Sequence, residues 1–321
     1  MSVAIEIDKL AQGILEGSER ALSRGLTLVE RGGEPSEDLL GQVYPHTGRA
    51  HVVGLTGSPG SGKSTLTAAL AREARNRGLK VGVIAIDPSS PYSGGSILGD
   101  RIRMNDVAFE MDVFIRSLAT HGALGGLSRA ATDSVDLMDA SGKELILVET
   151  VGVGQDEVDV MGAVHTVAVV SVPGLGDEIQ TLKAGILEIA DIHVVNKADR
   201  EGASRVQAEL RSMLVLNGST MSGWQPPILP CVAVNGEGIE TLLDAIRGHL
   251  DFLKSSGEFE HRRKRMVKAQ VLSITHDLVS EATSQECESD DLLERVVRRE
   301  LAPHAAGRAL LARLVSQKEG F

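Results

Sequence analysis

Short apolar runs alternate with longer amphipathic segments through the middle of the chain, from His51 to about Leu250. Runs such as 145–148 and 167–170 are continuously apolar, which is typical of strands buried on both faces of a parallel sheet. The predicted strands are 51–56, 81–86, 112–116, 144–149, 166–172, 191–196 and 228–234, and the predicted helices between them are 64–77, 124–140, 178–190, 201–216 and 238–255. This alternation predicts an α/β fold with a mostly parallel central sheet flanked by helices, and with ligands at the carboxyl ends of the strands.

The two ends of the chain show helical spacing only. Residues 1–48 repeat apolar positions every three or four residues, with a break at Gly32–Ser36. Past Gly257, one apolar stripe runs through Val267, Val271, Ile274 and Leu278. A helix with such a stripe needs a surface to pack on, and we favour a second copy of the chain. We therefore expect an N-terminal helical extension at 1–48, an α/β domain at 49–256 and a C-terminal helical arm at 257–321 that forms a homodimer.

Composition narrows the classes of partner. The 321 residues carry a formal net charge of −11, from 33 basic and 44 acidic side chains. Binding to nucleic acid or to an anionic membrane depends on clustered positive charge, so this balance argues against both. No apolar run approaches the length of a transmembrane helix, and the first residues do not resemble a secretory signal. Cys231 and Cys287 form no C-x-x-C pair, which favours reduced cysteines, and we expect a cytoplasmic protein.

A glycine-rich motif follows the first predicted strand. Residues 57–64 match G-x-x-x-x-G-K-S and lie between an apolar run and a helix-competent segment, the context that a P-loop requires. The loop amides and the positive end of the following helix would bind phosphate oxygens. Lys63 would reach the β- and γ-phosphates and Ser64 would hold Mg²⁺. The expected nucleotide contacts here are Gly57, Ser58, Pro59, Gly60, Ser61, Gly62, Lys63, Ser64 and Thr65. The fold class is thus that of a P-loop NTPase.

A second motif indicates which base is bound. The predicted strand 191–196 ends in Asn196-Lys197-Ala198-Asp199, an N-K-x-D sequence. Guanine presents two donors that the Asp199 carboxylate could accept, whereas adenine would leave that carboxylate unpaired. Asn196 would buttress the loop and the stem of Lys197 would cover the base. Val234 ends the last predicted strand, at a place where GTPases have a further base-contacting loop. We therefore expect GTP and GDP as ligands.

Carboxylates at other strand ends predict a magnesium site. Glu149 ends the apolar run 145–148, and the amide of Gly152 beyond it could meet the γ-phosphate. Asp87 ends another predicted strand and Asp100 lies in the loop that follows. Hard oxygen ligands suit Mg²⁺, so Asp87, Asp100 and Glu149 are the candidates beside Ser64.

The motifs together resemble the MeaB/ArgK family of GTPases. The resemblance rests on Gly57–Ser64, Asp87–Ser90, Gly94–Arg101, Glu149–Gln155 and Asn196–Asp199, and it covers nearly the whole chain. It implies a homodimeric, Mg²⁺-dependent GTPase that serves as a chaperone of an adenosylcobalamin-dependent acyl-CoA mutase. Such a chaperone gates cofactor loading and protects or reactivates the mutase, and an adenosyltransferase would be a further partner.

The same resemblance implies roles for individual residues. The catalytic set would comprise Lys63, Asp87, Glu149, Gln155 and Lys183. Of these, Lys183 belongs to a loop near 174–183 that would sense the mutase. Gln155 stands three positions beyond Gly152 and could position water only if its loop folds back.

Two alternatives and one open choice remain at this stage. A P-loop kinase or transport-associated ATPase would use the same phosphate loop, although N-K-x-D argues against it. A metallochaperone GTPase for another metalloenzyme would usually show clustered Cys or His. The partner could be methylmalonyl-, isobutyryl- or 2-hydroxyisobutyryl-CoA mutase, because Pro91-Tyr92-Ser93 departs from the T-R-T sequence found in many relatives.

Overall fold

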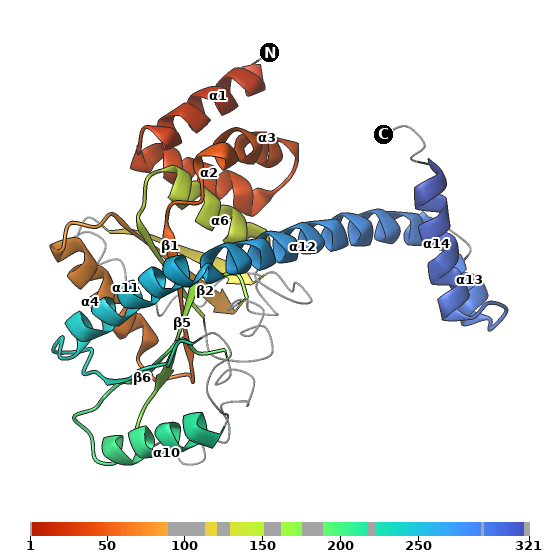
Figure 1. Ribbon diagram of the computed structural model, residues 1–321. Coiled ribbons are helices and arrows are strands. Elements are labelled where there is room, and N and C mark those ends of the chain that lie inside the picture. Colours follow the sequence, from red (N-terminus) through yellow and green to blue (C-terminus); the bar gives the residue numbers. More distant parts are fainter. Residues whose placement is uncertain are drawn as a thin grey trace. The chain divides into compact units, whose positions relative to one another are not determined.

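The computed structural model describes residues 2–88, 113–120, 129–150, 162–174, 189–216, 223–289 and 292–317. The chain divides into two compact units, Met1–Met266 and Val267–Phe321. The first unit contains the sheet, and Figure 1 shows its strands with helices on both sides.

Seven strands form one sheet in the order β3-β2-β4-β1-β5-β6-β7. Every pairing between neighbours is parallel, so the expected α/β fold with a parallel central sheet is confirmed. The strands are β1 (His51–Gly57), β2 (Val81–Pro88), β3 (Phe114–Thr120), β4 (Leu145–Glu149), β5 (Thr166–Ser171), β6 (Ile192–Val195) and β7 (Ile228–Pro230). Since all strands run the same way, the loops after β1, β4 and β6 meet at one edge of the sheet.

Helices cover both faces of this sheet. One apolar cluster joins α1 (Ser2–Leu15), α2 (Glu19–Arg31), α3 (Glu34–Val43), α6 (Arg129–Ala140) and α10 (Ala203–Leu216) to the strands. A second cluster joins α4 (Lys63–Asn76) and α11 (Ile239–Ser256) to the strands. Side chains alternate between the faces along each strand: Val52 belongs to the first cluster and Val53 to the second.

A buried carboxylate fixes the entry of the chain into β1. Asp139, in α6, accepts hydrogen bonds from the backbone amides of Gly48 at 2.6 Å and Ala50 at 3.1 Å. Burial raises the pKa of Asp139, and these backbone hydrogen bonds work against that rise. The contact ties the segment after the N-terminal helices to the helix that packs under them.

The boundaries of two strands differ locally from the predicted ones. The last strand ends at Pro230 rather than at residue 234, because residues 232–237 form a turn closed by a Val232–Glu237 bridge. Strand β3 spans Phe114–Thr120 rather than residues 112–116. The first residues of the predicted helix 124–140 and most of the predicted helix 178–190 lie outside the described residues.

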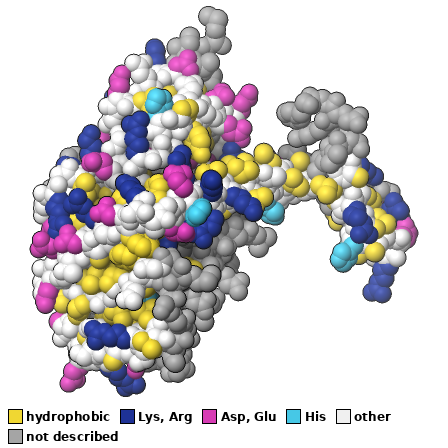
Figure 2. Space-filling model, viewed as in Figure 1, with side chains coloured by type: hydrophobic (Ala, Val, Ile, Leu, Met, Phe, Trp, Pro, Cys, Tyr) yellow, Lys and Arg dark blue, Asp and Glu magenta, His cyan; other side chains and the backbone are white. Residues whose placement is uncertain are grey.

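The C-terminal region is helical, as expected. It contains α12 (Glu258–Ser289), α13 (Leu292–Val297) and α14 (Pro303–Gln317). On α12, Val271 is 55% exposed, Leu272 57% and Leu278 51%. Figure 2 shows hydrophobic side chains along this helix. In the part of the chain that the structure describes, no helix has the length and apolarity needed to cross a membrane.

Candidate functional site

The phosphate loop joins the carboxyl end of β1 to the first turn of α4. Two of its glycines stand where a side chain would collide with a neighbour. A Cβ on Gly57 would lie 2.1 Å from the carbonyl oxygen of Val170 in β5, and one on Gly62 would lie 2.7 Å from Nδ2 of Asn196. Both glycines also have positive φ, 142° and 85°. The motif glycines therefore permit close packing of the loop against two adjacent strand ends.

Lys63 is folded onto the loop that precedes it. Its ammonium donates to the carbonyl oxygens of Gly57 at 2.7 Å and Ser58 at 3.1 Å. The residue is only 6% exposed, so its charge is held inside the loop rather than in solvent. This places a fixed positive charge at the N-terminus of α4, where the helix dipole has the same sign. Together they make the loop a binding site for anions.

Ser64 and Glu149 join the first turn of α4 to the end of β4. The Ser64 hydroxyl donates to Oε1 of Glu149 at 2.6 Å. Glu149 is the last residue of β4 and is 7% exposed. Because β4 pairs directly with β1, this carboxylate lies beside the phosphate loop. A hydroxyl and a carboxylate oxygen are thus adjacent at the start of α4.

Asn196 connects the phosphate loop to the two loops beyond β6 and β7. Its side-chain amide donates from Nδ2 to the Ser61 carbonyl at 2.8 Å, and its Oδ1 accepts from the Ala233 amide at 3.1 Å. Asn196 is 2% exposed. One buried side chain therefore sets the spacing of three loops at the same edge of the sheet.

Lys197 and its neighbours complete this edge. Lys197 has a φ of 55°, unusual for a residue other than glycine, and its ammonium donates to the Gly60 carbonyl at 2.7 Å. The amide of Ala198 donates to the Cys231 carbonyl at 3.0 Å, which holds the turn in place. Strained backbone held by several contacts is common at binding sites.

The remaining predicted contacts differ in how they are placed. Thr65 and Asp199 are exposed, and Val234 is 87% exposed, so all three side chains are accessible to a ligand. Asp87 is part of β2, two residues beyond Ala85, which pairs with Glu149 of β4. Asp100, Gly152, Gln155 and Lys183 lie outside the described residues.

Cys231 also lies at this edge of the sheet, but its thiol is not a reactive group. Burial raises the pKa of its thiol to about 12, so the sulfur stays protonated. A protonated, buried thiol is a poor nucleophile and a poor metal ligand. Within the described ranges, no group of three or more His, Cys, Asp or Glu side chains is arranged to hold a metal ion.

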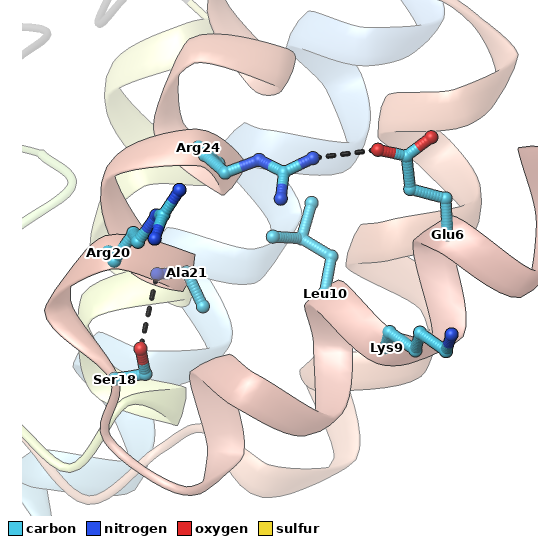
Figure 3. A pocket seen from close by; sticks show the side chains of 7 residues that line it. All are labelled: Glu6, Lys9, Leu10, Ser18, Arg20, Ala21 and Arg24. Carbon is cyan, nitrogen blue, oxygen red and sulfur yellow. Dashed lines mark hydrogen bonds and ion pairs between the residues drawn. The ribbon is translucent and has the colours of Figure 1, made fainter.

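A separate groove lies on the N-terminal helices. It has a volume of about 700 Å³ and is lined by α1, α2 and Ser18 between them. Figure 3 shows Arg24 paired with Glu6 across it, at 2.7 Å. The groove shares no residue with the loops at the carboxyl edge of the sheet.

A parallel sheet with a P-loop after β1, an acid at the end of β4 and an N-K-x-D loop after β6 defines a P-loop GTPase. Comparison with known proteins agrees. The sequence model of the family described as methylmalonyl Co-A mutase-associated GTPase MeaB matches residues 22–288. The chain belongs to this family and is a GTPase.

Relatives align along most of the chain. A predicted GTPase of Pyrococcus abyssi is 44% identical over 314 residues, covering 96% of this chain and 97% of that protein. GTPase ArgK of Escherichia coli is 39% identical, covering 82% and 81%. The mouse methylmalonic aciduria type A homolog is 35% identical, covering 86% and 70%. Among solved structures, one titled LAO/AO transport system kinase has a TM-score of 0.72 and 27% identity, and covers 96% of this chain and 97% of that one.

The sequence motifs predicted functional residues at the carboxyl edge of the sheet but none at the opposite, amino edge. At the amino ends of β1, β5 and β6, a buried cluster contains His51, Thr166 and Asp191 together with Arg262 from α12. These residues belong to no motif. The only signal in the sequence is Asp191, an acid directly before an apolar strand.

Proposed function

We propose that this GTPase is a chaperone of an adenosylcobalamin-dependent acyl-CoA mutase, in which GTP hydrolysis gates cofactor loading and protects or reactivates the mutase. The nucleotide half of the proposal is carried by one observation: Asn196 hydrogen-bonds both the phosphate loop and the loop at Ala233. The mutase half is supported by the family description and by the similarity to the methylmalonic aciduria type A homolog.

Guanine recognition would follow from the exposed carboxylate of Asp199. With Asn196 fixed by two hydrogen bonds, Asp199 is three residues along a turn whose backbone is also held. A guanine ring could then donate from N1 and its exocyclic amine to one carboxylate, with the Lys197 stem and Val234 on either side of the ring. Such paired recognition discriminates strongly against adenine.

The donor atoms at the start of α4 fit Mg²⁺. The hydroxyl of Ser64 and the carboxylate of Glu149 are hard oxygen donors within 2.6 Å of one another. Asp87 and Asp100 are proposed as further contributors. When bound, the ion would neutralise charge that develops on the β- and γ-phosphates. Lys63 and the loop amides would stabilise the same charge, while Gly152, Gln155 and Lys183 are proposed to contact the γ-phosphate side and couple it to the mutase.

We propose further that the protein works as a homodimer assembled through the helical arm. The exposed apolar side chains of α12, which include Val271, Leu272 and Leu278, support this because a solvated helix seldom carries so many. An adenosyltransferase is proposed as an additional partner in cofactor delivery.

Single-turnover GTP hydrolysis tests the proposal. The protein is mixed with GTP and Mg²⁺, alone and with purified methylmalonyl-, isobutyryl- or 2-hydroxyisobutyryl-CoA mutase. We expect slow turnover alone and acceleration by one of the mutases, with Lys63→Ala abolishing both. If none of the mutases changes the rate or binds the protein, the chaperone role is wrong and the GTPase assignment stands. ATP binding as tightly as GTP would instead favour the kinase alternative.

A further inference from the structure

The edge of the sheet opposite the phosphate loop contains a buried polar network. His51 is the first residue of β1, Thr166 is the first of β5, and Asp191 directly precedes β6. His249 joins them from α11 and Arg262 from the first turns of α12. All five belong to the first compact unit. The same strands end, at their other extremity, in the phosphate loop and in Asn196.

Hydrogen bonds connect His51, Thr166 and His249, and an ion-pair contact connects His249 to Asp191. Nε2 of His51 lies 2.7 Å from the Thr166 hydroxyl, which lies 2.8 Å from Nδ1 of His249. Nε2 of His249 lies 3.3 Å from Oδ1 of Asp191. Asp191 thus lies at the end of a line of polar side chains that begins at His51.

Arg262 donates two parallel hydrogen bonds to Asp191. Nη1 donates to Oδ2 at 2.7 Å and Nη2 donates to Oδ1 at 2.8 Å, while Nη1 also donates to the His165 carbonyl at 2.8 Å. Burial would raise the pKa of Asp191, but the interactions with His249 and Arg262 outweigh it and hold that pKa below its usual value. Two-point guanidinium–carboxylate contacts fix orientation as well as distance.

Asp191 also holds the neighbouring strand. Its Oδ2 accepts from the backbone amide of Val167 in β5 at 2.8 Å, and its carbonyl accepts from the Trp224 indole at 2.8 Å. The residue therefore anchors the start of β6 to β5, to the segment before β7 and to α12. Only the four residues of β6 separate it from Asn196.

We propose that Asp191, clamped by Arg262, is a positioning residue for guanine recognition. Strand β6 spans about 13 Å and is paired with β5 and β7 on either side, so it behaves as a short rigid rod. Its far end carries the Asn196–Asp199 loop. A change in the direction or register of the rod at Asp191 would displace the carboxylate that reads the base. The inference rests on the proposed guanine contact at Asp199.

The test compares the affinities of GDP and IDP for the full-length protein. Hypoxanthine lacks the exocyclic amine of guanine, which is one of the two donors assigned to Asp199. The ratio of the two affinities therefore reports the placement of that carboxylate. In Arg262→Met we expect this ratio to fall about tenfold, in the middle of the range for coupled contacts. Asp191→Asn should lower it similarly, and the double variant should lower it no further.

Arg263→Met is the matched control. Arg263 is adjacent in α12, and its ion pair is with Glu260 at 3.7 Å, so this substitution removes the same kind of side chain without touching Asp191. Ile246→Ala, in the core between α11 and the sheet, is a second control that destabilises the protein without changing the Asp191 contacts. Both controls should keep the wild-type ratio even if absolute affinity falls.

The outcomes separate this inference from the proposed function. A wild-type protein that binds GDP no better than IDP would overturn the guanine contact itself. A wild-type preference that survives unchanged in folded Arg262→Met would overturn the positioning role alone. If Arg262→Met does not fold, Arg262→Lys replaces it, since it keeps the charge and loses the two-point contact. An unchanged ratio in that variant also refutes the role.

Discussion

The hydroxyl of Ser64 donates to the carboxylate of Glu149 at 2.6 Å, although 85 positions separate them in the chain. The contact joins the first turn of α4 to the end of β4. Glu149 is 7% exposed, so its position is fixed by the packing of the sheet around it. The side chain of Glu149 reaches from the end of β4 to this hydroxyl.

Replacing this carboxylate tests its catalytic role. Glu149→Gln keeps the volume and removes the charge, so we expect GTP turnover to fall about 10²-fold, in the range for one lost electrostatic contact. GDP binding measured without Mg²⁺ should change little, because the phosphate loop is intact. Glu209→Gln, which removes an exposed ion pair with Arg205 on α10, is the control and should leave turnover unchanged. Equal loss in both variants would argue against a role for Glu149.

Asn196→Ala removes the side chain that joins three loops. It deletes the hydrogen bonds to the Ser61 carbonyl and from the Ala233 amide, both in buried surroundings. At about 1 to 1.5 kcal/mol each, we expect GDP affinity to fall roughly 30- to 150-fold by calorimetry. Asn235→Ala is the control, since Asn235 only accepts from the exposed Glu237 amide. A loss below threefold would mean that Asn196 does not organise the site.

The sheet and its nucleotide edge were largely predictable because their signals are local. The seven apolar runs that were read as strands are the seven strands of the sheet, and the P-loop and N-K-x-D motifs lie at the ends expected for them. The bounds of β3 were misplaced, and so was the end of the last strand. The turn after Pro230 is defined by a contact between Val232 and Glu237 rather than by composition.

The network at the other edge was not predictable, for a different reason. Its residues are scattered from His51 to Arg262, and none has a partner nearby in sequence. Only the fold brings these strand starts and the two helices together. The same holds for Gly57 and Gly62: the motif names them, but the carbonyl of Val170 and the amide of Asn196 that exclude a side chain become visible only in three dimensions.

Exposed apolar residues on α12 predict the behaviour of the arm. Introducing charge at two of them, in Val271→Glu with Leu278→Glu, should convert the proposed dimer to a monomer, measured by light scattering after size exclusion. Basal GTP turnover should remain within about twofold, because every residue that contacts nucleotide in the proposal lies in the other unit. Ser280→Glu, also exposed on α12, is the control. A wild-type protein that is monomeric at all concentrations would contradict the dimer.

Asp133, buried in α6, predicts one component of the pH dependence of stability. Burial raises its pKa from 3.8 to about 7, against the opposing charge of Arg129. A raised carboxyl pKa favours the folded state below pH 4, and this contribution is lost as the pH rises to about 7. A rise in the pKa from 3.8 to about 7 corresponds to at most about 4 kcal/mol. Asp133→Asn should flatten this loss in denaturant titrations across pH 4 to 8, whereas Asp38→Asn, exposed on α3, should not.

His193, buried in β6, predicts a loss of stability as the pH falls, opposite in sign to the effect of Asp133. It is 1% exposed in β6, and neither ring nitrogen has a hydrogen-bond partner in the described part of the chain. Burial lowers its pKa from 6.5 to about 4, so its contribution to stability is complete above pH 6.5 and is lost as the pH falls towards 4. His193→Leu removes both unpaired polar atoms from an apolar environment. We therefore expect the free energy of unfolding at pH 7 to rise by about 1 kcal/mol, and the loss between pH 6.5 and 4 to shrink by up to about 3 kcal/mol.

His46→Leu, at an exposed position, is the matched control. An acid profile that His193→Leu leaves unchanged would show that other histidines, such as His165 with a pKa that burial lowers to about 4, govern the transition.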